Sequence, residues 1–482
     1  MTRCAYPLMF EKSKPGRRAY DLPALDVPAQ KNLLPQALRS AANPNLPELS
    51  EVDVVRHFVG LSRRNYGVDN GFYPLGSCTM KYNPKIDEEV GVLFAQLHPL
   101  ADADCIGGAV DLMLHLQEAL CEVSGFDAFT LQPAAGAHGE YTGLTLIKAY
   151  HDHRGDTARN VIIVPDAAHG TNPASAALAG FKIREILSAP DGGVDLDALR
   201  AAMGPDVAGF MLTNPNTLGL FDKNIAQITQ IVHDGGGLCY YDGANFNAIM
   251  GVVRPGDMGF DVMHINLHKT FSTPHGGGGP GSGPVGCTKA LIPFLPTPQV
   301  VREGEHGRLD YDRPLSVGKV KAFFGNFSII ARAYAYILSL GGEGLKEASE
   351  NAVLNANYIF HHLKGTYGIA HDRICMHECI LTPGELEEYG VHTSDIAKAL
   401  IDFGYHPPTI YFPLIVHEAM MIEPCESESR ETLDAFITAM KEIAALAKAD
   451  PERMHKMPLT TPVGRPDEVA AARNPIVKYE WQ

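Results

Sequence analysis

The sequence lacks the long apolar segments that mark membrane proteins. No stretch approaches the roughly 18 uninterrupted apolar residues that suggest a transmembrane helix, so we expect no membrane span. The first residues, MTRCAYPLMFEKSKPGRR, contain no apolar signal-peptide core, and their acidic residue and prolines are unusual for a transit peptide. We therefore expect the chain in the cytoplasm.

An excess of positive charge is also missing. The chain has 40 lysines and arginines against 56 aspartates and glutamates, a net charge of −16, which argues against a general nucleic-acid binder. Hydrophobic residues make up 45% and charged residues 20% of its 482 residues, the usual composition of a soluble protein. This length is enough for two or three domains.

The nine cysteines form no disulfide framework. Their number is odd and they are scattered, which favours reduced thiols. Cys375 and Cys379 lie near His371 and His377, a combination that raises the question of a metal site. The spacing is not a usual zinc pattern and no second cysteine pair follows. We favour small buried residues and expect no metal.

A nucleotide P-loop is absent as well, although seven glycines lie within residues 276–286. No Gly-Lys-Ser or Gly-Lys-Thr follows them. Lys269 precedes this run, just after the apolar run Val262–Leu267. Burying an ammonium group is costly, so a lysine at the end of a buried strand is often functional, and its free amine can condense with a carbonyl. A surface lysine before a flexible loop is the alternative.

Strand and helix patterns alternate from Phe126 to about Ala290. This alternation predicts an α/β fold with a mostly parallel sheet and helices on both sides. Ligands bind such sheets beyond the carboxyl ends of the strands. The expected strands are 129–131, 161–164, 207–212, 238–241 and 262–267, with helices from about 136 to 150 and over 224–234.

The flanking regions predict three parts. Residues 1–125 read as an N-terminal arm and helical segment, with helices over 49–62 and 108–124 and a loop over 70–84 that can line a site if ordered. Residues 126–315 form the large domain. Residues 316–482 supply connecting helices over 317–340 and 345–365, then a smaller α+β domain with helices over 394–403 and 429–449. We expect the proline-containing ends, 1–50 and 458–482, to lie over other surfaces.

Polar residues follow several expected strands. The turn Ala135-Gly136-Ala137 precedes a helix, whose free N–H groups and dipole suit a phosphate. His169 follows the second expected strand and offers a flat ring, and Asp242 and Lys269 end the fourth and fifth. Each has an ordinary alternative as a turn or capping residue. Together they meet the needs of pyridoxal phosphate, which requires a lysine, a carboxylate for the ring nitrogen and an anion site.

This chain order resembles the fold type I pyridoxal-phosphate enzymes, the aspartate aminotransferase fold. Five segments are similar to the glycine decarboxylase P-protein family of the glycine cleavage system, and they run from near residue 70 to near residue 430. That family exists as one long chain or as two subunits, and this chain resembles the second, lysine-bearing subunit. The segments are PLGSCTMK at 74–81, HGTNPAS at 169–175, NLHKTFSTPHGGGGPGSGP at 266–284, YHPPTIYFP at 405–413 and MIEPCESES at 421–429.

The resemblance implies roles for individual residues. Lys269 would form the Schiff base with the cofactor, Asp242 would hold the ring nitrogen, and His169 would stack on the ring. Gly136, Ala137 and His268 would hold the phosphate, and Thr217 would reach the ring hydroxyl. For the carboxylate of glycine, the candidates are Ser77 and Thr79.

The resemblance also implies substrate and partners. Glycine would be decarboxylated, and its aminomethyl group would pass to the lipoyl arm of H-protein. The companion would be P-protein subunit 1, in a heterotetramer of two subunit types. Three alternatives remain: a cysteine desulfurase-like enzyme, an aminotransferase-like enzyme, and a non-catalytic scaffold half of a complex.

Overall fold

The computed structural model describes residues 6–29, 33–40, 42, 44–98, 101–275 and 279–478. The chain divides into two compact units, one made of Met1–Asn70 with Lys456–Gln482 and the other of Gly71–His455. The predicted domain limits at 125/126 and 315/316 fall inside the second unit and stay predictions. Among the described residues, no helix is both long and apolar enough to cross a bilayer.

The first unit contains the helix predicted over 49–62. It is α2 (Glu51–Ser62), and the Ser50 hydroxyl caps it by accepting the N–H of Asp53 at 3.2 Å. Asp53 also pairs with Arg17 at 3.0 Å, which ties the preceding arm to this helix. The placement of the arm over other surfaces stays a prediction. The unit's other helices are α1 (Met9–Lys12), a 3-10 turn (Gln36–Leu38) and α14 (Glu468–Arg473).

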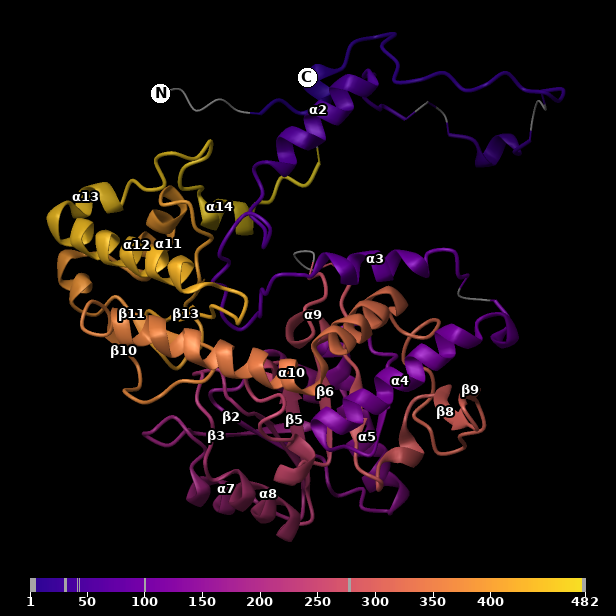
Figure 1. Ribbon diagram of the computed structural model, residues 1–482, viewed down its shortest axis with the longest axis vertical. Helices are drawn as coiled ribbons and strands as arrows, with labels where there is room; N and C mark the ends of the chain where they lie inside the picture. Colours follow the sequence, from indigo (N-terminus) through magenta and orange to yellow (C-terminus); the bar gives the residue numbers. More distant parts are fainter. Residues whose placement is uncertain are drawn as a thin grey trace. The chain divides into compact units, whose positions relative to one another are not determined.

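A seven-stranded sheet forms the centre of the second unit (Figure 1). Its order is β1-β7-β6-β5-β4-β2-β3, and the pairs from β3 to β6 are parallel, whereas β7 runs antiparallel to both neighbours. The mostly parallel sheet is therefore confirmed. The strands are β1 (Ala128–Thr130), β2 (Val161–Pro165), β3 (Lys182–Ile186), β4 (Val207–Thr213), β5 (Leu238–Gly243), β6 (Val262–Ile265) and β7 (Val285–Cys287).

Helices cover both faces of this sheet. Successive residues of a strand point to opposite sides, so two neighbouring residues show which helices lie on each face. Tyr240 packs with the apolar residues of α5 (Gly136–His153) and α6 (Thr171–Leu178). Its neighbour Tyr241 packs on the other face with α4 (Gly107–Ser124), α8 (Ile225–Asp234) and α10 (Phe327–Leu363). Burial on both faces explains the uninterrupted apolar runs of β2, β4 and β5. A further helix, α7 (Leu196–Ala202), adds Leu199 to the second face.

Two strands differ from the sequence prediction. The edge strand β3 was not expected, because its sequence, KIREI, carries three charges and only Ile186 is buried. Strand β6 ends at Ile265, and the next residues form a helical turn, α9 (Leu267–Thr270). Lys269 therefore lies on this turn, four residues beyond the strand.

The long helix α10 begins ten residues later than predicted. Gly325 lies just before it with a φ of +90°, which is not helical, and a side chain there would meet the carbonyl of Leu131 at 2.2 Å, so the helix cannot begin earlier than this crowded turn. The predicted break at Gly341 is confirmed by its non-helical φ of +64° and ψ of −177°. Figure 1 shows α10 running from beside α3 (Lys85–Leu93) toward the smaller sheet.

The smaller α+β region follows α10, as predicted. Its four-stranded antiparallel sheet has the order β10-β11-β13-β12, with β10 (Gly368–Ile369), β11 (Cys379–Thr382), β12 (Thr409–Ile410) and β13 (Met420–Ile422). Helices α11 (Thr393–Asp402) and α12 (Arg430–Ala449) match the two predicted helices, and α13 (Pro451–Met454) follows. The 71–84 loop is ordered against β13, since the Gly76 N–H donates to the Met421 carbonyl at 3.2 Å.

The remaining ordered pieces are short. The hairpin β8 (Gln299–Glu303) and β9 (His306–Asp310) packs on α4. The 3-10 turns of this unit are Ala103–Cys105, Phe246–Ala248, Pro255–Met258, Ile292–Phe294 and Gly384–Tyr389.

Candidate active site

A cavity of about 140 Å³ lies at the carboxyl ends of β4, β5 and β6. The parallel register brings Thr213, Asp242 and His264 into one row across these strands, because Thr213 is opposite Asp242 and Asp242 is opposite His264. The start of α5 and the 71–84 loop complete the cavity. Seven predicted site residues line it: Ser77, Gly136, Ala137, His169, Thr217, Asp242 and Lys269.

Lys269 reaches this cavity from α9. Its Nζ donates a hydrogen bond of 2.7 Å to the carbonyl of Ser77. The sequence placed the lysine at the end of a strand, and the helical turn after the strand instead directs it across the sheet edge toward the loop. A primary amine is therefore held at the wall of a small polar cavity, where it can condense with a carbonyl compound.

Asp242 is buried at the end of β5. One carboxylate oxygen accepts from Asn172 Nδ2 at 2.8 Å, and the other accepts from the Ala244 N–H at 2.9 Å and lies 3.3 Å from His264 Nε2. Burial alone raises the pKa of Asp242. The adjacent imidazole and these hydrogen bonds outweigh burial, so its pKa lies below the ordinary value. The cavity wall therefore offers an ionised carboxylate that can hold a protonated nitrogen.

His169 belongs to a polar chain that lines the same cavity. Its Nδ1 lies 2.8 Å from the Thr171 hydroxyl, which donates to Glu140 at 2.7 Å. The ring also contacts Phe412 edge-on, with 5.3 Å between ring centroids. Burial, with the positive charge of Lys269, lowers the pKa of His169, so a neutral flat ring faces the cavity.

The anion turn begins α5 as predicted. Gly136 is the first helical residue, so the N–H groups of this first turn have no partner within the helix. Backbone segments approach closely here: a side chain at Gly136 would meet Asn266 Nδ2 at 2.5 Å, and one at Gly283 would meet the Ala135 carbonyl at 2.1 Å. This arrangement is typical of a phosphate-binding helix N-terminus.

Three predicted site residues have side chains that already form hydrogen bonds within the protein. The hydroxyl of Thr217 donates to the carbonyl of Ala167 although the residue lines the cavity. His268 lies outside the cavity lining, and its Nδ1 accepts from the Ser282 N–H at 3.4 Å. Burial lowers the pKa of His268 to about 3, so it offers no positive charge to a phosphate. Thr79 is a buried residue of the 71–84 loop, and its hydroxyl donates to Glu423 at 2.5 Å.

Sequence reasoning missed several polar residues of this site. His264 could have been predicted, because it is the polar residue in an otherwise apolar strand, but only Asp242 on the neighbouring strand was predicted. Asn172 and Glu423 lie inside the segments HGTNPAS and MIEPCESES, yet neither was singled out. Glu140, Thr171, Asn245, Asn266 and Glu378 also line the cavity.

A fully buried acidic cluster adjoins this cavity. One oxygen each of Glu378 and Glu423 and one ring nitrogen of His377 lie within 4.8 Å of one another. Two carboxylates at that separation repel by roughly 3 to 4 kcal/mol at an effective dielectric constant of about 20. Burial and the charge of Glu423 raise the pKa of Glu378 well above its ordinary value. Burial also raises the pKa of Glu423, to about 7.

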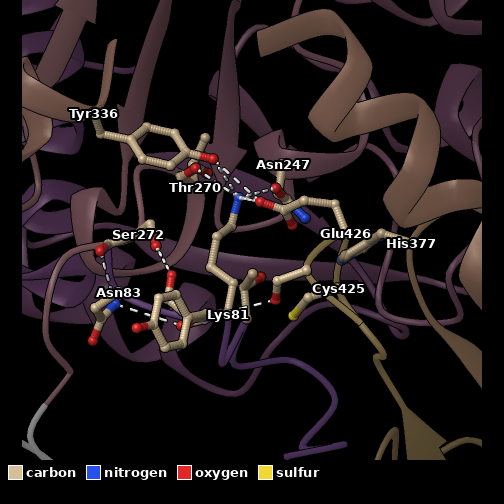
Figure 2. A network of polar contacts seen from close by, with 12 residues as sticks. Lys81, Asn83, Asn247, Thr270, Ser272, Tyr336, His377, Cys425 and Glu426 are labelled. Atoms are coloured by element: carbon tan, nitrogen blue, oxygen red, sulfur yellow. Dashed lines mark hydrogen bonds and ion pairs between the residues drawn. The ribbon is translucent and has the colours of Figure 1, made fainter. Parts of the chain in front are cut away.

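Lys81 forms the centre of a second buried network (Figure 2). Its Nζ lies 2.8 Å from Glu426 Oε1 and donates to Asn247 Oδ1 at 2.6 Å and to the Thr270 carbonyl at 3.0 Å. Burial lowers the pKa of Lys81, but Glu426 outweighs it and the pKa lies above the ordinary value. The network joins the 71–84 loop, the turn that carries Lys269, and the segment after β13. The hydroxyl of Tyr336 lies 3.4 Å from the same nitrogen.

The chain is similar to glycine dehydrogenases over nearly its whole length. Residues 348–457 match the family model described as "Glycine dehydrogenase, C-terminal domain". The chain is 60% identical over 477 residues to the "Probable glycine dehydrogenase (decarboxylating) subunit 2" of Caldanaerobacter subterraneus subsp. tengcongensis, with 98% of each chain covered. The protein with the same name from Alkaliphilus oremlandii is also 60% identical, again with 98% of each chain covered.

The fold has a counterpart among solved structures. An inhibitor-bound glycine decarboxylase (P-protein) of the glycine cleavage system superimposes with a TM-score of 0.71 over 85% of this chain and 93% of that chain, at 20% identity. The predicted fold class, fold type I with a large mostly parallel sheet and a smaller C-terminal region, is confirmed as a fold. At 60% identity over nearly its whole length, the chain belongs to the family of glycine dehydrogenase (decarboxylating) subunit 2 proteins.

Proposed function

We propose that this chain binds pyridoxal phosphate at Lys269 and catalyses the decarboxylation of glycine, with transfer of the aminomethyl group to the lipoyl arm of H-protein. One observation carries the proposal: an amine, an ionised carboxylate and a helix N-terminus line a single small cavity. The relatives' names supply the reaction, glycine dehydrogenase (decarboxylating).

The residues present fit this cofactor. Among the described residues, Thr213 Oγ1, Asn266 Oδ1 and Glu140 Oε2 are buried without a hydrogen-bond partner, and all three residues line the cavity. Buried polar atoms are rarely left unpartnered, so their presence supports a polar ligand. Pyridoxal phosphate, when bound, supplies a ring that accepts the electron pair left when carbon dioxide departs.

The chain's own residues would then divide the work. Lys269 binds the carbonyl carbon, and the ionised Asp242 keeps a proton on the ring nitrogen. The first turn of α5, at Gly136 and Ala137, binds the phosphate, and the neutral ring of His169 provides a flat contact. Ser77 lines the cavity and stays the candidate for the glycine carboxylate, whereas the hydroxyl of Thr79 is turned to Glu423.

The partners follow from the same proposal. The words "subunit 2" in the relatives' names support a companion, P-protein subunit 1, and we propose a heterotetramer of two subunit types. Lipoylated H-protein would accept the aminomethyl group. The cytoplasmic location stays a prediction.

The test begins with the visible spectrum of the full chain, purified with and without its companion, before and after borohydride reduction. We expect a yellow protein whose reduced label maps to Lys269. Lys269→Ala should lose the colour and all release of carbon dioxide from carboxyl-labelled glycine. Lys289→Ala, which changes an exposed lysine, is the matched control and should behave as the parent chain.

Other outcomes would support the alternatives. A colourless protein in both preparations would favour the scaffold. Sulfur release from cysteine would favour a desulfurase, which needs a reactive thiolate near the lysine. Cys78 is the thiol beside Lys269, and burial raises its pKa, so it stays largely protonated. Amino-group transfer to a keto acid would favour an aminotransferase.

A further inference from the structure

The acidic cluster beside the cavity has no role in the function proposed so far. Glu378, Glu423 and His377 are each completely buried. Glu378 also lines the cavity that contains Lys269. Glu423 lies behind it, joined to the 71–84 loop through Thr79. The cluster is therefore a buried acidic site with one member open to the substrate.

The backbone of a single residue, Ser77, links Glu378 to Lys269. The Ser77 N–H donates to Glu378 Oε2 at 2.8 Å, and the Ser77 carbonyl accepts from Lys269 Nζ. This leaves Glu378 Oε1 and Glu423 Oε2 buried without a partner among the described residues. If both carboxylates were ionised, one oxygen of each would lack a donor, whereas one added proton turns an unpartnered acceptor into a donor.

The charges around the cluster favour a proton rather than a metal ion. Lys269 and Lys81 both act on the cluster and disfavour a further cation. Burial and these lysines lower the pKa of His377 to about 3, so its ring is neutral and the carboxyls carry the titration. The other titratable groups facing the carboxyls are Glu426 and the thiols of Cys78, Cys375, Cys379 and Cys425.

We propose that Glu378 and Glu423 form an acid–base pair that holds one proton, accepts a second from the ammonium group of incoming glycine, and returns it to Lys269 when the lysine is displaced. Glu378 is the catalytic member because it lines the cavity. Glu423 and Thr79 are positioning residues. The inference rests on the proposed function, because it concerns the exchange of glycine for Lys269.

The protons balance without any further reactant. Glycine arrives as an ammonium ion, and one N–H bond breaks as an O–H bond forms on the carboxyl pair. A second proton of glycine would pass directly to Lys269 Nζ as glycine takes the lysine's place on the cofactor. Lys269 is thereby released as a neutral amine, takes the first proton back from the pair, and ends as an ammonium ion. Two carboxyl groups sharing a site suit this task, because repulsion moves one ionisation toward neutral pH.

The pair itself can be tested without cofactor or turnover. We expect the infrared spectrum of the full chain near neutral pH to show a protonated carboxyl C=O band, which weakens as the pH is raised. Glu378→Gln and Glu423→Gln should each remove or shift this band. Glu428→Gln, which changes a half-buried carboxyl outside the cluster, should leave it unchanged. The proposal would be overturned if the spectrum lacked this band, or if neither Glu378→Gln nor Glu423→Gln changed it.

The catalytic role is tested on the cofactor-loaded chain, by following the change in visible absorbance after glycine is added. Glu378→Gln should slow this change by about a hundredfold, as expected for a lost acid–base group, whereas Glu428→Gln should not. Thr79→Val removes a hydrogen bond that favours ionised Glu423, so the pH at which the rate rises should move upward. An unchanged rate in Glu378→Gln would exclude the role.

The proposed function can fail separately. A parent chain that neither takes up pyridoxal phosphate nor responds to glycine would contradict that function. The infrared band would in that case still decide whether the two carboxyls share a proton.

Discussion

The Nζ of Lys269 donates a hydrogen bond to the carbonyl of Ser77, which lies 192 residues earlier in the chain. Ser77 adopts a φ of +67°, a left-handed conformation that costs a non-glycine residue about 1 kcal/mol or more. Its carbonyl faces the lysine and its N–H faces Glu378. The unfavourable backbone conformation therefore directs two groups of one loop residue toward the site.

Substitutions at Ser77 should separate the backbone from the side chain. Ser77→Gly tolerates the left-handed conformation, so we expect full stability and nearly normal cofactor binding. Ser77→Val places a β-branched residue there and should destabilise the fold by about 1–2 kcal/mol. Urea unfolding measures the stability of each variant, and titration with pyridoxal phosphate measures its cofactor binding. Ser339→Val, on helix α10, is the control, and equal losses in Ser77→Gly and Ser77→Val would show that the hydroxyl matters instead.

Lys81 is expected to be a stability determinant through its buried ion pair with Glu426. Lys81→Met leaves a buried carboxylate without its cation, and breaking such a pair costs about 3–5 kcal/mol. Lys81→Met combined with Glu426→Gln removes both charges and should recover a large part of that loss. Urea unfolding of the two single variants and the double variant gives the coupling free energy.

The control for Lys81 is Lys346→Met, which breaks an exposed pair with Glu350 and should cost less than about 1 kcal/mol. If the free energy of unfolding lost in the double variant equalled the sum of the losses in the two single variants, Lys81 and Glu426 would act independently. The network drawn in Figure 2 would then not be the source of the stability.

Gly283 should be intolerant of a side chain. A Cβ there would lie 2.1 Å from the carbonyl oxygen of Ala135, the residue directly before α5, so the phosphate turn would have to shift. We expect Gly283→Ala to cost about 1–3 kcal/mol of stability and to weaken pyridoxal phosphate binding at least about tenfold. Gly342→Ala, where nothing lies within 4 Å, should change neither quantity. Unchanged affinity in Gly283→Ala would argue against the α5 turn as the phosphate site.

The buried strands could be predicted because their apolar runs are unbroken, whereas the edge strand β3 could not, because its exposed faces carry Lys182, Arg184 and Glu185. Lys269 and Asp242 were predictable because strand ends collect functional residues. The pair Glu378 and Glu423 was not, since its members meet only when β11 and β13 pair. Lys81 lay in a recognised segment, but its partner follows it by 345 residues, and no periodicity reports such a contact.

Glu423 predicts how stability depends on pH. Its pKa is raised from an ordinary value of 4.5 to about 7 in the folded chain. The folded state therefore binds this proton more tightly than the unfolded state, so the stabilisation is complete below about pH 4.5 and disappears as the pH rises through about 7. Glu378 shifts in the same direction. Asp242 shifts the opposite way, from 3.8 downward, and changes stability only in more acidic solution.

The free energy of unfolding of the parent chain should fall, relative to that of Glu423→Gln, by about 3 kcal/mol between pH 4.5 and pH 7, since one pKa unit corresponds to about 1.4 kcal/mol. Urea unfolding at a series of pH values measures both chains. Glu442→Gln, on the exposed side of α12, should keep the slope of the parent chain, because it leaves the buried carboxyl in place. Parallel slopes for the parent chain and Glu423→Gln would mean that Glu423 titrates alike in the folded and unfolded states, and the protonated buried pair would have to be abandoned.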